Sequence, residues 1–157
     1  MERRLDLTLS HSLIGLRSRE CADAEIEITW GEGNRAQGML LQEGLVLLDP
    51  LSDEEFGADV IIRTPERFSA DKRAQRTLQI PFTIIDNAEL ALFSAEDELA
   101  VELDTTPGDY TLIYEICLGR DVFYTLTLLK GKIEAATALK ADGWGLKKGQ
   151  VLLAGTF

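Results

Sequence analysis

The chain has 157 residues, 45% of them hydrophobic and 27% charged, a composition that predicts one folded domain over 1–157 rather than a disordered chain. Its 27 Asp and Glu residues outnumber the 16 Lys and Arg residues, which gives a formal net charge of −11. A field of that sign disfavours direct contact with nucleic acid or anionic lipid, and it favours cations or a basic protein partner. The N-terminus lacks the apolar run of a secretory signal and no segment is long enough to span a membrane, so we expect a cytoplasmic protein.

The first half of the chain predicts short strands separated by turns. Apolar and polar residues alternate at 5–9 and again at 25–29, and such alternation lines one face of a half-buried strand. Turn residues follow at 31–34 (GEGN) and at the Asp-Pro pair of 49–50. The segment 51–57 carries a weak helical signal, because a serine is placed to cap it and acidic residues fill its first turn.

The middle of the chain continues this pattern. The polar segment 66–74 is predicted to be a loop, and alternation returns at 78–84, at 90–92 and at 99–103. Pro81 lies inside the first of these runs. Because proline cannot donate a hydrogen bond to a neighbouring strand, Pro81 predicts an edge strand or a bulge at that point.

The clearest hairpin follows, formed by segments 109–118 and 121–130 on either side of a Gly119-Arg120 turn. Many short strands with regular turns and no long helical segment predict an all-β fold, an antiparallel β-sandwich. The part 119–157 ends in a tail with more lysine and glycine, in which we expect two strands around a glycine-flanked turn or a cover for a sheet edge. We therefore expect 119–157 to be a C-terminal extension packed on the sandwich.

The residues that usually carry chemistry are sparse, which predicts that the chain is not an enzyme and holds no cofactor. His11 is the single histidine and has no second ligand or nucleophile at a useful spacing. Neither a nucleophile elbow nor a phosphate-binding loop is present. Cys21 and Cys117 lie among apolar strand residues, as small buried hydrophobes do, and are expected in a reducing compartment. Trp144 lies between two glycines, where it either folds back over the sheet or anchors an interface.

Two groups of acidic residues are the candidate binding site. Asp53, Glu54 and Glu55 follow a predicted strand, and Asp97 and Glu98 precede another. Three interpretations remain open for them: a solvated acidic surface, a patch that meets a basic partner, and a calcium site formed by sandwich loops. No residue is assigned to a metal, because the spacing matches no EF-hand loop and a sandwich calcium site draws its ligands from several separate loops.

Several segments, taken in order, resemble those of a known family. They are LTLSHSLIGL at 7–16, ITWGEG and AQGMLLQEGLVLLD within 28–49, VIIRT at 60–64, RTLQIPFTIIDNAELAL at 76–92 and LAVELDTTPGDYTLIYEI at 99–116. In this order the chain resembles the competence protein J family over about residues 5–118. The part from 119 to 157 looks longer than the family pattern.

The resemblance implies a non-enzymatic protein that inhibits a DNA-degrading nuclease by direct contact. An acidic protein can occupy the basic groove in which a nuclease holds phosphates, so the expected partner is a basic nuclease. The five acidic residues named above are the expected contact residues on charge alone. Two other hypotheses stay open: a calcium- or ligand-binding sandwich module, and an assembly protein that pairs sheet edges into a homo-oligomer.

Overall fold

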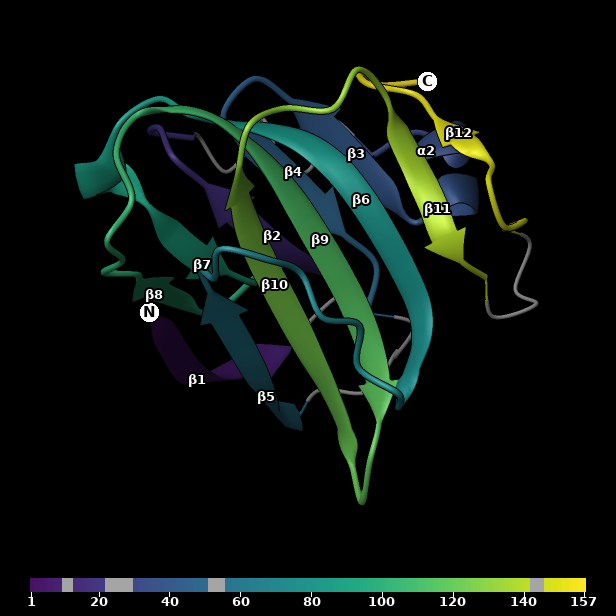
Figure 1. Ribbon diagram of the computed structural model, residues 1–157, viewed down its shortest axis with the longest axis horizontal. Helices are drawn as coiled ribbons and strands as arrows, with labels where there is room; N and C mark the ends of the chain where they lie inside the picture. Colours follow the sequence, from purple (N-terminus) through teal and green to yellow (C-terminus); the bar gives the residue numbers. More distant parts are fainter. Residues whose placement is uncertain (10–12, 22–29, 51–55, 142–145) are drawn as a thin grey trace.

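The computed structural model describes residues 1–9, 13–21, 30–50, 56–141 and 146–157. Within these ranges the regular structure consists of two β-sheets, one short α-helix and one 3-10 helix (Figure 1). The predicted all-β class is therefore confirmed. Several predicted features lie outside the described residues: His11, the strand at 25–29, the first residues of the turn at 51–57, and Trp144.

The larger sheet has seven strands in the order β1-β5-β10-β9-β6-β11-β12. In chain order, these strands are β1 (Glu2–Leu9), β5 (Phe56–Arg63), β6 (Ala74–Ile84), β9 (Gly108–Leu118), β10 (Val122–Lys130), β11 (Ala136–Lys140) and β12 (Val151–Leu152). The smaller sheet has five strands in the order β3-β4-β2-β7-β8. These are β2 (Ile14–Arg17), β3 (Met39–Gln42), β4 (Leu45–Leu48), β7 (Ala91–Phe93) and β8 (Glu98–Ala100).

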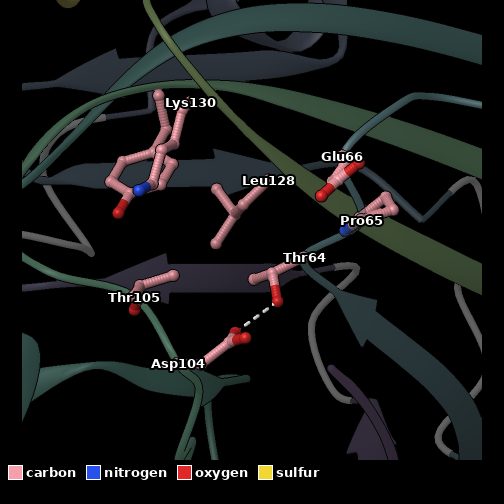
Figure 2. A pocket seen from close by; sticks show the side chains of 8 residues that line it. Thr64, Pro65, Glu66, Asp104, Thr105, Leu128 and Lys130 are labelled. Carbon is pink, nitrogen blue, oxygen red and sulfur yellow. Dashed lines mark hydrogen bonds between the residues drawn. The ribbon is translucent and has the colours of Figure 1, made fainter.

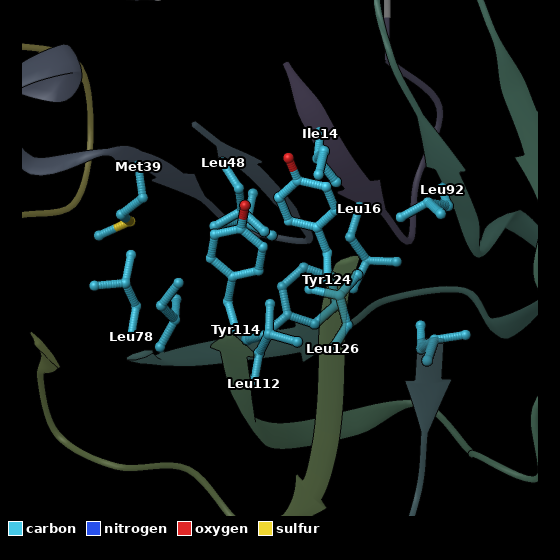
Figure 3. Packing of buried hydrophobic residues seen from close by; sticks show 14 of the residues in the cluster. Ile14, Leu16, Met39, Leu48, Leu78, Leu92, Leu112, Tyr114, Tyr124 and Leu126 are labelled. Atoms are coloured by element: carbon cyan, nitrogen blue, oxygen red, sulfur yellow. The ribbon is translucent and has the colours of Figure 1, made fainter. Parts of the chain in front are cut away.

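The two sheets share one apolar core (Figure 3). The core cluster includes Leu16 and Leu48 of the smaller sheet together with Leu78 and Leu126 of the larger sheet, each with no exposed surface. Burying each such side chain stabilises the fold by roughly 2 kcal/mol. The alternation found at 78–84 places Leu78 on the inner face, whereas Leu48 lies in a strand that is buried at all four positions.

Two tyrosines lie in the core between the sheets. The rings of Tyr114 in β9 and Tyr124 in β10 are stacked, with centroids 6.3 Å apart and planes 7° from parallel. Their hydroxyls donate hydrogen bonds to the carbonyls of Asp49 (3.2 Å) and Pro50 (3.1 Å). The buried phenols thereby fix the backbone just before segment 51–55.

The predicted hairpin is confirmed, because β9 and β10 pair antiparallel with Leu118 opposite Val122 beside the turn. The expectation of a purely antiparallel fold is wrong at one place: β10 pairs parallel with β5, with Tyr124 opposite Val60. The reason is the connection after β5, which crosses the outer face of β10 and β9 before β6 begins (Figure 1). The hairpin therefore lies between β5 and β6, two strands that run in the same direction.

The crossing connection is the loop predicted at 66–74, and it is held by a buried carboxylate. Glu115 of β9 has no exposed surface and accepts a hydrogen bond from the backbone N–H of Asp71 (3.0 Å) and another from the Thr125 hydroxyl (2.8 Å). The N–H of Leu118 donates to the Arg73 carbonyl (2.9 Å). Both faces of β9 are consequently buried, which the alternation in the sequence does not predict.

Pro81 lies in β6, which is an edge strand over only part of its length. β6 pairs with β9 on one side, where Pro81 is opposite Thr111, and with β11 on the other side. The ladder to β11 covers only Thr77–Gln79, so Pro81 lies beyond it and costs that ladder no hydrogen bond. The register irregularities fall elsewhere, between Ala74 and Arg76 of β6 and between Ala138 and Lys140 of β11.

The turn predicted at 31–34 is the start of an α-helix, α2 (Glu32–Gln37). Gly31 caps its N-terminus, and Gly38 ends it in the left-handed conformation, with φ at 79°. A helix of six residues is too short to show a 3.6-residue period, which is why the sequence favoured a turn.

The tail forms two strands, as expected, at the edge of the larger sheet. β11 pairs with β6 and β12 pairs with β11 (Figure 1). The segment after β12 returns to the smaller sheet, where the N–H of Gly155 donates to the Leu41 carbonyl (2.8 Å). Of the strands in 119–157, β10 lies in the middle of the sheet, whereas β11 and β12 lie at its edge.

Candidate functional site: an acidic depression beside the five-stranded sheet

The site is organised around Arg17, the last residue of β2. Its Nη1 lies 2.9 Å from Oε2 of Glu89 and its Nη2 lies 2.6 Å from Oε1 of Glu98. It also donates to the Glu89 carbonyl, at 2.8 Å. A single guanidinium therefore holds two carboxylates that are far apart in the sequence.

Strand pairing explains why these three residues meet. β2 pairs with β7, which places Arg17 opposite Ala91, and β7 pairs with β8, which places Phe93 opposite Glu98. Glu89 ends the 3-10 helix η1 (Asn87–Glu89), just before β7. The chain therefore brings one basic and two acidic side chains together at the β8 edge of the smaller sheet.

The protonation of Arg17 is secure. Partial burial by itself lowers the pKa of the guanidinium, but the hydrogen bonds and charges of Glu98 and Glu89 outweigh it, so the pKa lies above its ordinary value. The Arg17 side chain is 17% exposed, whereas that of Glu98 is 55% exposed. The cation is thus mostly covered, and the Glu98 carboxylate is the more exposed group of the pair.

These residues line a shallow depression of about 450 Å³, completed by Glu20 and Cys21. Three carboxylates face one guanidinium there, so the lining has an excess of two negative charges. Such a surface attracts a cationic group of a partner and repels phosphate.

The five predicted contact residues differ in their structural surroundings. Glu98 lies in the depression, and its neighbour Asp97 has a structural contact, because its Oδ2 accepts a hydrogen bond from the N–H of Thr8 (3.0 Å). Asp53, Glu54 and Glu55 lie outside the described residues. A contact role for these five residues stays a prediction.

Sequence reasoning missed Arg17, Glu20 and Glu89. Arg17 ends the apolar run LIGLR, and such a charge at the end of a strand was the only available signal. Glu20 and Glu89 fall in separate segments whose proximity depends on the pairing of β2 with β7. That pairing is a long-range contact that no local pattern encodes.

The described part of the chain also bears on other features weighed from the sequence. No three His, Cys, Asp or Glu residues gather there as a metal site. Cys21 and Cys117 form no disulfide, and burial raises the pKa of the Cys117 thiol to about 12, with further contributions from Glu115 and Asp71. No helix among the described residues is both long enough and apolar enough to cross a bilayer.

Comparison with known structures defines the class of fold. The chain is similar to ComJ of Bacillus subtilis, described as an inhibitor of the DNA-degrading activity of NucA, with a TM-score of 0.65 and 14% identity over 83% of this chain and 96% of that one. It is also similar to a protein described as crocagin biosynthetic gene J, with a TM-score of 0.54 and 16% identity over 82% of this chain and 96% of that one. At these identities the likeness shows a shared fold. Comparison with curated proteins finds no match.

The sequence itself decides the family. The model of the Competence protein J (ComJ) family matches residues 6–129, so the chain belongs to that family. The resemblance seen in the sequence is confirmed, but it extends further than 118. The β9–β10 hairpin lies inside the family match except for its last residue, Lys130, and the match leaves 130–157 at the C-terminal side uncovered.

Proposed function

We propose that this protein is a non-enzymatic inhibitor that binds a DNA-degrading nuclease directly. Family membership over residues 6–129 carries the proposal, and a structurally similar member is described as an inhibitor of the nuclease NucA. The net charge of −11 agrees with it, because an acidic protein competes with DNA for the basic groove of a nuclease.

We infer that the acidic depression around Arg17 forms part of the contact surface. Glu20, Glu89 and Glu98 offer carboxylates to basic side chains of the nuclease, while Arg17 fixes the last two in position. Preorganised carboxylates lose little side-chain entropy when a partner binds, which favours affinity. Asp97 beside them contributes mainly by tying β8 to β1.

We also infer that the two sheets form a sandwich. The shared core cluster, which draws on strands of both sheets, supports this arrangement. Two of the lining residues, Arg17 and Glu98, lie on strands of the smaller sheet, which holds this part of the depression in a fixed position.

The inhibition assay follows the degradation of plasmid DNA by a purified NucA-type nuclease while this protein is titrated in. We expect near-stoichiometric inhibition at low salt that weakens as salt rises, because exposed charge pairs are screened. Undiminished nuclease activity at a large excess of the protein would contradict the proposed function.

The location of the contact surface is tested with two charge reversals of equal size. Glu20→Lys changes the depression, and Glu134→Lys changes an exposed acidic residue of the tail, outside the family match. In the Glu20→Lys variant, one exposed ion pair with the nuclease is replaced by a repulsion between like charges, which costs about 1.4 kcal/mol of binding free energy. We therefore expect Glu20→Lys to weaken inhibition about tenfold. Equal effects of both variants would show that only net charge matters and would exclude the depression.

A further inference from the structure

A second cavity lies where β5 and β10 end, and it shares no lining residue with the depression (Figure 2). It has a volume of about 410 Å³, within the range of roughly 300 to 1,000 Å³ typical of small-molecule sites. Thr64, Pro65 and Glu66 follow β5 on one side, and Asp104 and Thr105 come from the loop between β8 and β9. Nothing in the proposed inhibitory function uses it.

The cavity has an apolar floor. Leu128 of β10 is 1% exposed and Tyr110 of β9 is 4% exposed, and both line it. The Tyr110 hydroxyl is already engaged, since it donates to the Thr106 carbonyl (2.9 Å) and accepts from the Thr106 N–H (3.1 Å). The tyrosine therefore offers its ring, rather than its hydroxyl, to an occupant.

One wall is acidic and held in place. The Thr64 hydroxyl donates to Oδ1 of Asp104 at 2.5 Å, and the Thr64 N–H donates to the Met1 carbonyl at 2.9 Å. The hydrogen bond from Thr64 holds the pKa of Asp104 below its ordinary value, with the N-terminal ammonium and Lys130 adding to the effect. Asp104 is thus charged at neutral pH, and the carboxylate of Glu66 lies nearby on the same cavity.

The facing group is a cation. Lys130, the last residue of β10, lines the cavity and is exposed, and the described residues give it no ion pair. Figure 2 shows Leu128 between Lys130 and the carboxylates of Glu66 and Asp104. Opposite charges therefore face the same space: Lys130 helps to lower the pKa of Asp104, but no ion pair joins the two groups.

We propose that this cavity binds a small zwitterion, an amino acid with an apolar side chain. Its ammonium group faces Asp104 and Glu66, its carboxylate faces Lys130, and its side chain lies on Leu128 and the Tyr110 ring. A simple cation would meet Lys130, a simple anion would meet the two carboxylates, and a neutral apolar molecule would desolvate all three charges without a partner. A zwitterion satisfies both signs at once.

The test is an NMR or calorimetric titration of the full chain with L-leucine, leucinamide and N-acetyl-leucine. Leucinamide lacks the carboxylate that Lys130 recognises, and N-acetyl-leucine lacks the ammonium that Asp104 recognises. We expect L-leucine to bind most tightly and each analogue about fivefold more weakly, the contribution of one partly exposed charge pair. Absence of saturable leucine binding, or equal affinity for all three probes, would overturn the proposal.

Variants then assign the binding to this cavity. Lys130→Met should reduce the affinity for L-leucine about fivefold and leave that for leucinamide unchanged. The matched control is Lys140→Met, which removes an exposed lysine of β11 and should change neither. If both lysine variants behave alike, the ligand binds elsewhere and the assignment is wrong. Because the nuclease assay is separate, failure here leaves the inhibitory function untouched.

Discussion

Gln37 at the end of α2 joins the tail to the body of the protein, and replacing it tests that role. Its side chain is 4% exposed, and its Nε2 donates to the carbonyls of Met39 and Leu153, both at 2.8 Å. Its Oε1 accepts from the N–H of Leu153 at 2.9 Å. One amide thus bonds to two segments more than a hundred positions apart in the sequence. The variant Gln37→Leu keeps the size of the side chain and removes all three hydrogen bonds.

The expected cost follows from these contacts. Each lost hydrogen bond lowers the free energy of unfolding by about 1 kcal/mol, and the added apolar surface of leucine returns about 1 kcal/mol of the total. The net loss is therefore about 2 kcal/mol. For a chain of 157 residues this corresponds to a decrease in Tm of roughly 4 to 8 °C.

The assay is urea unfolding followed by tryptophan fluorescence, together with hydrogen exchange at the Leu153 amide. We expect Gln37→Leu to lower the unfolding midpoint and to speed exchange at Leu153. The control is Gln75→Leu, an exposed glutamine of β6 whose replacement should stay within about 0.5 kcal/mol of the parent protein. An effect of Gln37→Leu no larger than that of the control would refute the role of Gln37 in holding the tail.

Two further predictions concern buried titratable groups. Burial raises the pKa of Tyr114 and of Tyr124 in the folded state, so stabilisation from their neutral forms is complete below about pH 10 and is lost as pH rises through the folded-state values. Phenolate absorbance should show both rings ionising only together with alkaline unfolding; ionisation near pH 10 with native fluorescence would contradict their burial. The thiol of Cys117 is buried and has a pKa near 12, so a thiol reagent at neutral pH should label the half-buried Cys21 alone. Two labels per native chain, counted by mass spectrometry, would count against this assignment.

The sequence could predict the part of the site that depends on local composition. Glu98 was expected to meet a partner because acidic residues gather around it, and the depression includes it. Arg17 could not be predicted, because its role depends on two carboxylates that reach it through strand pairing. The buried Glu115 was missed for a related reason: its face of β9 is covered by a loop from another part of the chain.

By itself the sequence determined several of the strands and the family. Alternation with a period of two is a local property, so it identified β1, β6 and the β9–β10 hairpin, and the order of their segments led to the competence protein J family. Only the tertiary structure decided the strand order, the parallel pairing of β5 with β10 and the return of the tail to α2. These features arise from contacts between distant segments, whose free energy depends on the burial of whole faces rather than on any local pattern.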